Sequence, residues 1–277
     1  MDTRRLLTLS GIIAGIFALA FFIFYAGVYS GTVRALRLTQ DGTNETVWKS
    51  DGAIMLLVPA GQTVADTGKK RVKKQTADFL LDKQEVTNAR YAAFLNAVGY
   101  EKGRELMPMS GIELAGKTKT FVSQEGKDEL PVTGVSWLGA AAYCRFHAKR
   151  LPTALEHQKA CSPDYVPHVF RLGRLGFTFN PLKYRDRSGY LHKAGFMRDN
   201  RLGVYDIAAN AAEWTQDVYA ADFGLSGAYP ESALNTRTLA GGSFSAGPSC
   251  FLRRGFAVGD TPQDAGFRCA ADLERWP

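Results

Sequence analysis

Residues 131–144 read PVTGVSWLGAAAYC, and their second half has the pattern of a helix. Ser136 is suited to begin it, because its hydroxyl can accept a hydrogen bond from an unpaired backbone N–H of the first turn. The apolar residues that follow are spaced by three, one and three positions, which places them on one helix face. This predicted buried face consists of Trp137, Ala140, Ala141 and Cys144.

A second helix is predicted upstream of this stretch. It begins at Thr87 or Asn88 and ends at Gly99, a residue typical of helix ends. Its apolar face consists of Tyr91, Phe94, Leu95 and Val98. Short apolar runs at residues 54–59 and 79–81 come before it and predict two strands.

A third helix is predicted downstream, where Thr153 and Glu156 have the spacing of a capping box. Ser162-Pro163 ends it, and beyond residue 165 the chain consists of short segments between Gly, Asn and Pro. Five basic residues between Lys69 and Lys74, interrupted only by Val72, predict a solvated loop. A patch for an acidic partner or for lipid head groups is the alternative.

The order of the motifs along the chain resembles the formylglycine-generating enzyme family, also called the sulfatase-modifying factor family. Each motif is weak alone, and their common order over about 220 residues carries the resemblance. They are DKQEVTN (82–88), PVTGVSW (131–137), AYC (142–144), KRLPT (149–153), GVYDI (203–207), NAAEW (210–214), GGSF (241–244) and GFRCA (266–270). The resemblance implies an α+β fold related to C-type lectins, with little regular secondary structure, over residues 53–277.

The four cysteines are Cys144, Cys161, Cys250 and Cys269, and none forms a C-x-x-C pair. An even number favours two disulfides in an oxidising compartment, and four buried thiols are the alternative. The resemblance implies that Cys144 bridges Cys269, which leaves Cys161 for Cys250.

Oxidases of this family hold copper(I) with two cysteines, separated by four intervening residues, after the GGSF strand. The matching positions here are Ala246 and, five residues on, Phe251; Cys250 is one place off. Copper(I) prefers thiolate ligands, so no copper is expected. The family's iron enzymes use a histidine-rich site with an added helical domain, which this chain lacks, so no iron is expected either.

The resemblance also implies a structural calcium site. Its carboxylates would be Glu85, Asp206 and Glu213, with the backbone carbonyls of Ala209 and Ala211. Calcium prefers such oxygen ligands, and three carboxylates brought together without a cation would repel one another. The alternative is that Glu85 and Glu213 cap helices or pair with arginine.

Residues 6–29 carry no charge and, as a helix, would span roughly 36 Å, more than the roughly 30 Å hydrocarbon core of a bilayer. They predict one transmembrane helix after a cytoplasmic tail of residues 1–5, followed by a linker of residues 30–52. A cleaved signal peptide or a buried helix is the alternative. Gly11, Gly15 and Ala18 would give the span a close-packing face, although chance accounts for such spacing as well.

These features lead to an expected single-pass protein of the bacterial inner membrane, with its C-terminal domain in the periplasm. We expect a non-catalytic accessory, assembly or structural subunit of a membrane-bound complex, which could be respiratory, with an integral membrane protein as partner. A metal-dependent oxidoreductase acting on a protein thiol or a small aromatic substrate is the alternative. The net charge of +7 over 277 residues is too weak a surplus to predict nucleic-acid binding.

Overall fold

The computed structural model describes residues 44–66, 71–116, 119–162, 190–197, 200–220 and 234–273. The predicted span at residues 6–29, with Gly11, Gly15 and Ala18, lies outside the described residues. In the described part, no helix has the length and apolar character needed to cross a bilayer. The chain divides into Met1–Thr46 and Val47–Pro277, and the second unit holds the features below.

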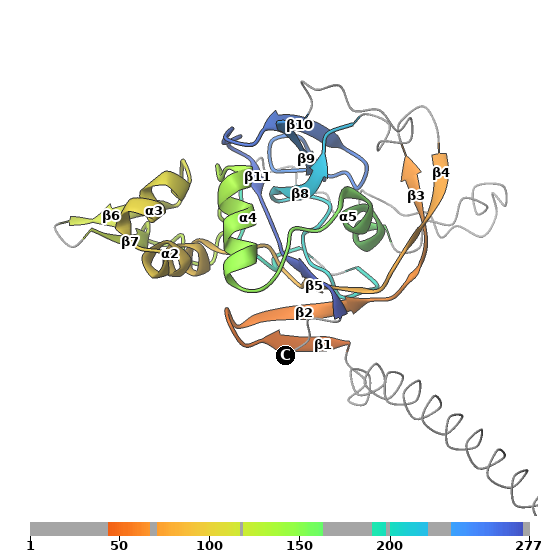
Figure 1. The fold of residues 1–277 in the computed structure, drawn as a ribbon, viewed down its shortest axis with the longest axis horizontal. Helices are drawn as coiled ribbons and strands as arrows, with labels where there is room; N and C mark the ends of the chain where they lie inside the picture. The colour runs from red at the N-terminus through yellow and green to blue at the C-terminus, as the bar shows by residue number, and fades with distance from the viewer. Residues whose placement is uncertain are drawn as a thin grey trace, which may run out of the picture. The chain divides into compact units, whose positions relative to one another are not determined.

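Two four-stranded sheets form the framework of this unit (Figure 1). The first has the order β1-β2-β5-β12, with β1 at Glu45–Trp48, β2 at Ala53–Val58, β5 at Phe79–Asp82 and β12 at Ala270–Ala271. The second has the order β10-β9-β8-β11, with β10 at Arg253–Ala257, β9 at Thr236–Ala240, β8 at Ala212–Val218 and β11 at Ala265–Gly266. The end of the chain therefore joins both sheets, since β11 pairs with β8 and β12 with β5.

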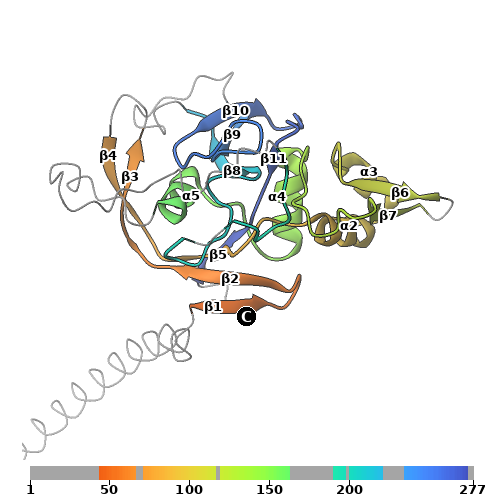
Figure 2. The same ribbon diagram turned by 180° about the vertical axis from the view of Figure 1, so that it is seen from behind.

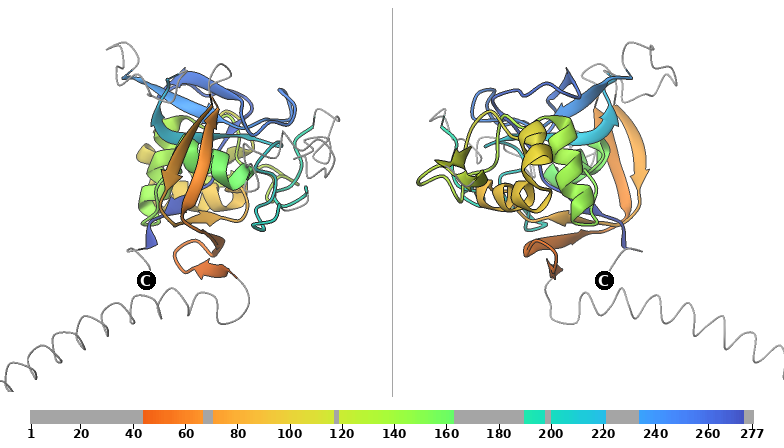
Figure 3. Two further views of the ribbon diagram at one scale, coloured as in Figure 1. Left: turned by 90° about the vertical axis from the view of Figure 1, so that its right-hand side faces the viewer. Right: turned by 60° about the vertical axis from the view of Figure 1, so that its left-hand side comes forward.

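Helices and hairpins complete the unit. The helices are α2 (Asn88–Ala97), α3 (Tyr100–Leu106), α4 (Trp137–Phe146) and α5 (Ala154–Cys161). The hairpins are β3–β4 (Gly61–Asp66 and Arg71–Thr76) and β6–β7 (Ile112–Ala115 and Thr120–Ser123). Figures 1 and 2 show α4 and α5 between the two sheets, with α2, α3 and the β6–β7 hairpin together on one side. Figure 3 shows the β3–β4 hairpin running past α5, which it contacts.

The predicted caps are confirmed at all three helices. The side chains of Thr87, Ser136 and Thr153 each accept a backbone hydrogen bond at their helix start, and Thr153 and Glu156 form the capping box. Gly99 follows α2 with φ +86°, a conformation that glycine adopts without strain.

The structure differs from the sequence prediction in three places. Trp137 is only partly buried, because it lies at the edge of the core with the Arg237 guanidinium 4.6 Å from its ring centre. Of the basic run, Arg71, Lys73 and Lys74 lie in β4, not in a loop, because their strand pairs antiparallel with β3, and Lys69 and Lys70 lie outside the described residues. Strand β1 falls within the expected linker, and its Trp48 is buried in a small core cluster.

The main core packs the helices against the ends of both sheets. Tyr91, Tyr143 and Phe267 pack ring against ring at its centre, with centroids 5.4–5.9 Å apart. Trp214 on β8 is fully buried and donates its indole N–H to the Val135 carbonyl at 2.8 Å. The core thereby fixes the segments around residues 82–85, 205–213 and 264–269, which carry the predicted site.

Candidate functional site

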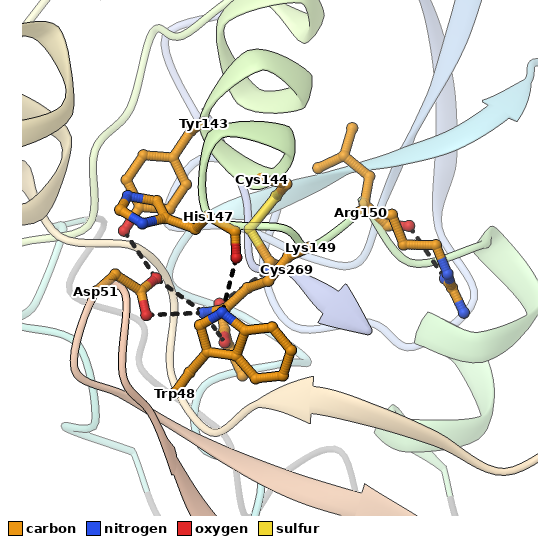
Figure 4. Close-up of a disulfide and its surroundings, with 10 residues drawn as sticks. Trp48, Asp51, Tyr143, Cys144, His147, Lys149, Arg150 and Cys269 are labelled. Atoms are coloured by element: carbon orange, nitrogen blue, oxygen red, sulfur yellow. Dashed lines mark hydrogen bonds and ion pairs between the residues drawn. A yellow bond between two sulfur atoms is a disulfide. The ribbon is translucent and has the colours of Figure 1, made fainter. Parts of the chain in front are cut away.

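Both disulfides of the predicted pairing are present. Cys144 on α4 is bonded to Cys269 beside β12, and Cys161 at the end of α5 is bonded to Cys250 (Figure 4 shows the first). The bridges close loops of 125 and 89 residues, so each removes much conformational freedom from the unfolded chain. The four cysteines are all oxidised, and none is a free thiol.

The predicted carboxylates meet in a buried cluster around Arg268. Its guanidinium donates from Nε to both carboxylate oxygens of Glu213, at 2.8 and 2.9 Å, and from Nη2 to Oε1 at 2.7 Å. The remaining donors of Arg268 reach the carbonyls of Asp82, Lys83 and Tyr205 at 2.9–3.2 Å. Arg268 and Glu213 are both fully buried.

Burial and charge act in opposite directions on Glu213. Burial alone would raise its pKa, but the charge and hydrogen bonds of Arg268, together with His157, outweigh burial and hold the pKa of Glu213 below its ordinary value. His157 on α5 adds to this effect, with its Nε2 3.4 Å from Glu213 Oε2. Glu213 is therefore an ionised partner of Arg268.

Glu85 and Asp206 are in a different electrostatic state. Burial, and then the negative charge of Asp206, raise the pKa of Glu85 well above its ordinary value. Burial also raises the pKa of Asp206, although backbone N–H groups of Gly195 and Met197 donate to its carboxylate at 2.5 and 2.7 Å. Asn210 donates to Glu85 Oε1 at 3.1 Å, and no donor in the described part reaches Oε2. A proton on Glu85 would therefore be shared with Asp206.

This donor set does not fit calcium in its present arrangement. Arg268 already binds both oxygens of Glu213, and Glu85 favours its neutral form. Ala209 and Ala211 are buried in the turn between Asp206 and Glu213. Within the described ranges, no three His, Cys, Asp or Glu side chains are arranged to hold a metal ion. Glu213 forms an ion pair with Arg268, which is the arginine alternative given above for this residue. Calcium binding stays a prediction.

The loop where the resemblance places the family's copper site begins with a close approach of two backbone segments. A side chain on Gly242 would lie 2.1 Å from the Gly247 carbonyl oxygen and 2.5 Å from that of Ala208, so only glycine fits there. Gly247 and Ser243 exchange backbone hydrogen bonds at 2.8 and 3.2 Å. Ala246, which the resemblance places at the first family cysteine, is exposed in this turn.

A hydroxyl and carboxylate network lies behind the turn. Asp264 accepts hydrogen bonds from the hydroxyls of Ser243 and Ser245, both at 2.6 Å, and from Arg254 at 2.8 Å. Burial would raise the pKa of Asp264, but these three donors hold it below its ordinary value. Asp264 is therefore an anchor for the loop. Phe251 lies half-buried near Cys250, and its backbone N–H donates to the Ser249 hydroxyl.

Two residues that organise this region, Arg268 and Asp264, were not predicted from the sequence. Arg268 lies inside the GFRCA motif, so its position signalled importance, but nothing in the sequence shows that its partner is Glu213, 55 residues away. Asp264 has no motif around it, and only the fold brings it to the 243–245 turn.

Comparison with known proteins identifies the family. A profile described as "Sulfatase-modifying factor enzyme 1-like domain" matches residues 40–273. The chain belongs to this family. It is 28% identical to the formylglycine-generating enzyme of Mus musculus over 280 aligned residues, covering 79% of this chain and 75% of that protein. It is 31% identical to the inactive C-alpha-formylglycine-generating enzyme 2 of Bos taurus, covering 54% and 53%.

Two other similarities, one in sequence and one in structure, extend the comparison. The chain is 31% identical to the serine/threonine-protein kinase Pkn1 of Chlamydia trachomatis over 218 residues, 71% of this chain and about a third of Pkn1. The structure of PvdO from Pseudomonas aeruginosa superposes with a TM-score of 0.61 at 21% identity, covering 83% and 98% of the two chains. The solved structure thus supports the fold alone.

Proposed function

We propose that this family member is non-catalytic and acts by contact, as an accessory, assembly or structural subunit of a membrane-bound complex. One feature of the sequence supports the proposal: the family resemblance places the copper-binding cysteines at positions where this chain has Ala246 and Phe251. The neighbouring Cys250 is bonded to Cys161, so it offers no thiolate for a metal. A relative named as inactive, 31% identical, is consistent with this role.

The location is part of the same proposal. Residues 6–29 would anchor the chain in a bacterial inner membrane, and residues 53–277 would lie in the periplasm. The uncharged run of the span and the two disulfides support this arrangement, since disulfides persist in oxidising compartments. The face of Gly11, Gly15 and Ala18 would pack against a helix of the partner, because small residues allow close approach in lipid.

The decisive experiment purifies the full-length protein in mild detergent and measures its metal content and its co-purifying proteins. We expect no stoichiometric copper or iron, and a specific membrane protein in constant ratio. Gly11→Leu with Gly15→Leu should release that partner, while Ser10→Ala, next to the packing face, should retain it. Stoichiometric copper or iron together with oxidation of a thiol or phenol substrate would replace this proposal with the oxidoreductase alternative. If the double variant keeps its partner, residues 6–29 serve only as a membrane anchor and not as a binding face.

A further inference from the structure

A cavity of about 430 Å³ opens beside α2, away from the predicted family sites. Its walls come from the turn at residues 49–52, from Arg90 and Phe94 on one face of α2, and from Phe146 and His147 at the end of α4. None of these elements carries a residue of the calcium or copper positions. The cavity is therefore a separate feature of the domain.

One side of the cavity is apolar and aromatic. The rings of Phe94 and Phe146 meet edge to face with centroids 5.4 Å apart, and Phe146 also meets the His147 ring at 5.0 Å. Phe146 is 49% exposed, which is high for a phenylalanine anchored beside a cavity. These rings present a surface that a flat apolar group would cover.

The other side carries unpaired positive charge. Lys49 has no hydrogen bond or ion pair to any described residue, and the half-buried Arg90 donates only to the Gly52 carbonyl, at 3.3 Å. Neither cation has a carboxylate partner in the described part of the chain. An arginine and a lysine held near each other favour a carboxylate or phosphate between them.

The one acidic wall residue, Asp51, is already neutralised. Lys149 Nζ donates to both of its carboxylate oxygens, at 2.8 and 3.0 Å, and the Tyr143 hydroxyl donates to Oδ2 at 3.1 Å (Figure 4). Lys149 also pairs with the buried Asp82 at 2.9 Å. Among the described residues, the cavity wall therefore carries two cations, Lys49 and Arg90, and one carboxylate that is already paired with Lys149, which leaves the wall with net positive charge.

We propose that this cavity binds a small organic anion, a carboxylate that carries an aromatic or similar flat apolar group. Lys49 and Arg90 would hold the carboxylate, and the Phe94 and Phe146 rings would cover the apolar part. Inorganic phosphate would satisfy the cations but leave the rings uncovered. A neutral aromatic would cover the rings but leave the cations unmatched.

The test measures binding of phenylacetate to the full-length protein by ligand-observed NMR titration. Phenylacetate should bind saturably, at least about tenfold more tightly than either phenylacetamide, its neutral isostere, or inorganic phosphate, because one charge-assisted contact is worth about that factor. Equal binding of phenylacetamide, equal binding of phosphate, or no saturable binding of phenylacetate would each overturn the proposal.

Variants locate the binding within the cavity. Lys49→Gln should weaken phenylacetate binding about tenfold, and Ala93→Phe should abolish it by filling the space while keeping both cations. Arg90→Gln should weaken phenylacetate binding as well, and Arg90→Lys should recover part of the lost affinity. Comparing the two variants separates the effect of the positive charge from that of the hydrogen bond to the Gly52 carbonyl. The control is Lys102→Gln, an exposed lysine of α3 paired with Glu105. Unchanged affinity in both Lys49→Gln and Ala93→Phe would place the ligand elsewhere and overturn the proposal.

Discussion

The two buried ion clusters of this domain contain similar groups in different surroundings. Around Arg268, one guanidinium donates to Glu213 and to three backbone carbonyls, and the side chains of Arg268 and Glu213 are both fully buried. Around Lys149, one ammonium serves Asp51 and Asp82, and Asp51 lines a cavity. The first cluster is sealed by the fold, whereas the second borders a cavity at Asp51, whose side chain is itself only 3% exposed.

The difference follows from the chemistry of the two cations. A guanidinium has five donors in a planar fork, so Arg268 can bind a carboxylate and still satisfy carbonyls from separate segments. An ammonium has three donors, and Lys149 uses them on two carboxylates. The Arg268 cluster therefore joins segments of the fold, whereas the Lys149 cluster positions an acidic side chain at a cavity wall.

Removing the Arg268 guanidinium should lower the free energy of unfolding by the largest amount. Arg268→Met leaves Glu213 charged and buried without its partner, a change that typically lowers the free energy of unfolding by about 3–5 kcal/mol. Urea unfolding would measure it, with the exposed Arg104→Met on α3 as control. A double variant Arg268→Met/Glu213→Leu should recover part of the loss, because it removes the unpaired charge. An Arg268→Met protein as stable as the native one would contradict this account.

Removing the Lys149 ammonium should lower the free energy of unfolding by a smaller amount. Lys149→Met leaves Asp82 unpaired in the interior, but Asp51 can take water from the cavity. We expect a loss of about 2–3 kcal/mol, below that of Arg268→Met. The same unfolding assay, with Lys102→Met as control, measures the difference. If the two losses are equal, or their order is reversed, the distinction between the sealed cluster and the cluster beside the cavity does not hold.

Bound calcium would increase the difference between the two clusters, because it would add a second cation to the buried cluster around Arg268. If Glu85, Asp206 and Glu213 hold an ion with the carbonyls of Ala209 and Ala211, calcium at a hundred times its Kd would add about 2.7 kcal/mol of stability. A chelator should then lower the Tm, and Glu213→Gln should remove that response. Elemental analysis finding no calcium, with an unchanged Tm in chelator, would leave Arg268 as the only cation that these carboxylates need.

Sequence patterns predicted those parts of the molecule that depend on neighbours in the chain. The caps at Thr87, Ser136 and Thr153 were predictable because a hydroxyl and the N–H that it accepts lie three residues apart. The disulfide pairing and the family fold came from the resemblance, and both are supported.

The parts that remained hidden depend on contacts across the fold. Helix α3 was not predicted because it has only seven residues and contains Gly103, and glycine is unfavourable inside a helix. The fold needs glycine at this position, since a side chain there would lie 2.4 Å from the Phe121 ring. The partner of Glu213 was left open between calcium and arginine, since the sequence cannot show which cation the fold brings near. The cavity was missed because its walls come from residues 49–52, α2 and α4, which no local pattern connects.

The smallest expected effect concerns the proton shared within the sealed cluster. Because burial and Asp206 raise the pKa of Glu85, the folded state binds this proton more tightly than the unfolded state does. The stabilisation is complete below the ordinary pKa of 4.5 and is lost as pH rises from there through the folded pKa.

Glu85→Gln tests this directly, since the amide imitates the protonated acid. It can accept from Asn210 and donate toward Asp206 at any pH. Unfolding measured from pH 5 to pH 8 should show the variant gaining on the native protein as pH rises, while the exposed Glu125→Gln should show no such trend. A difference between variant and native protein that stays constant with pH would mean that Glu85 is ionised in the folded state. Arg268 would then have to balance three charged carboxylates instead of one ionised pair and a shared proton.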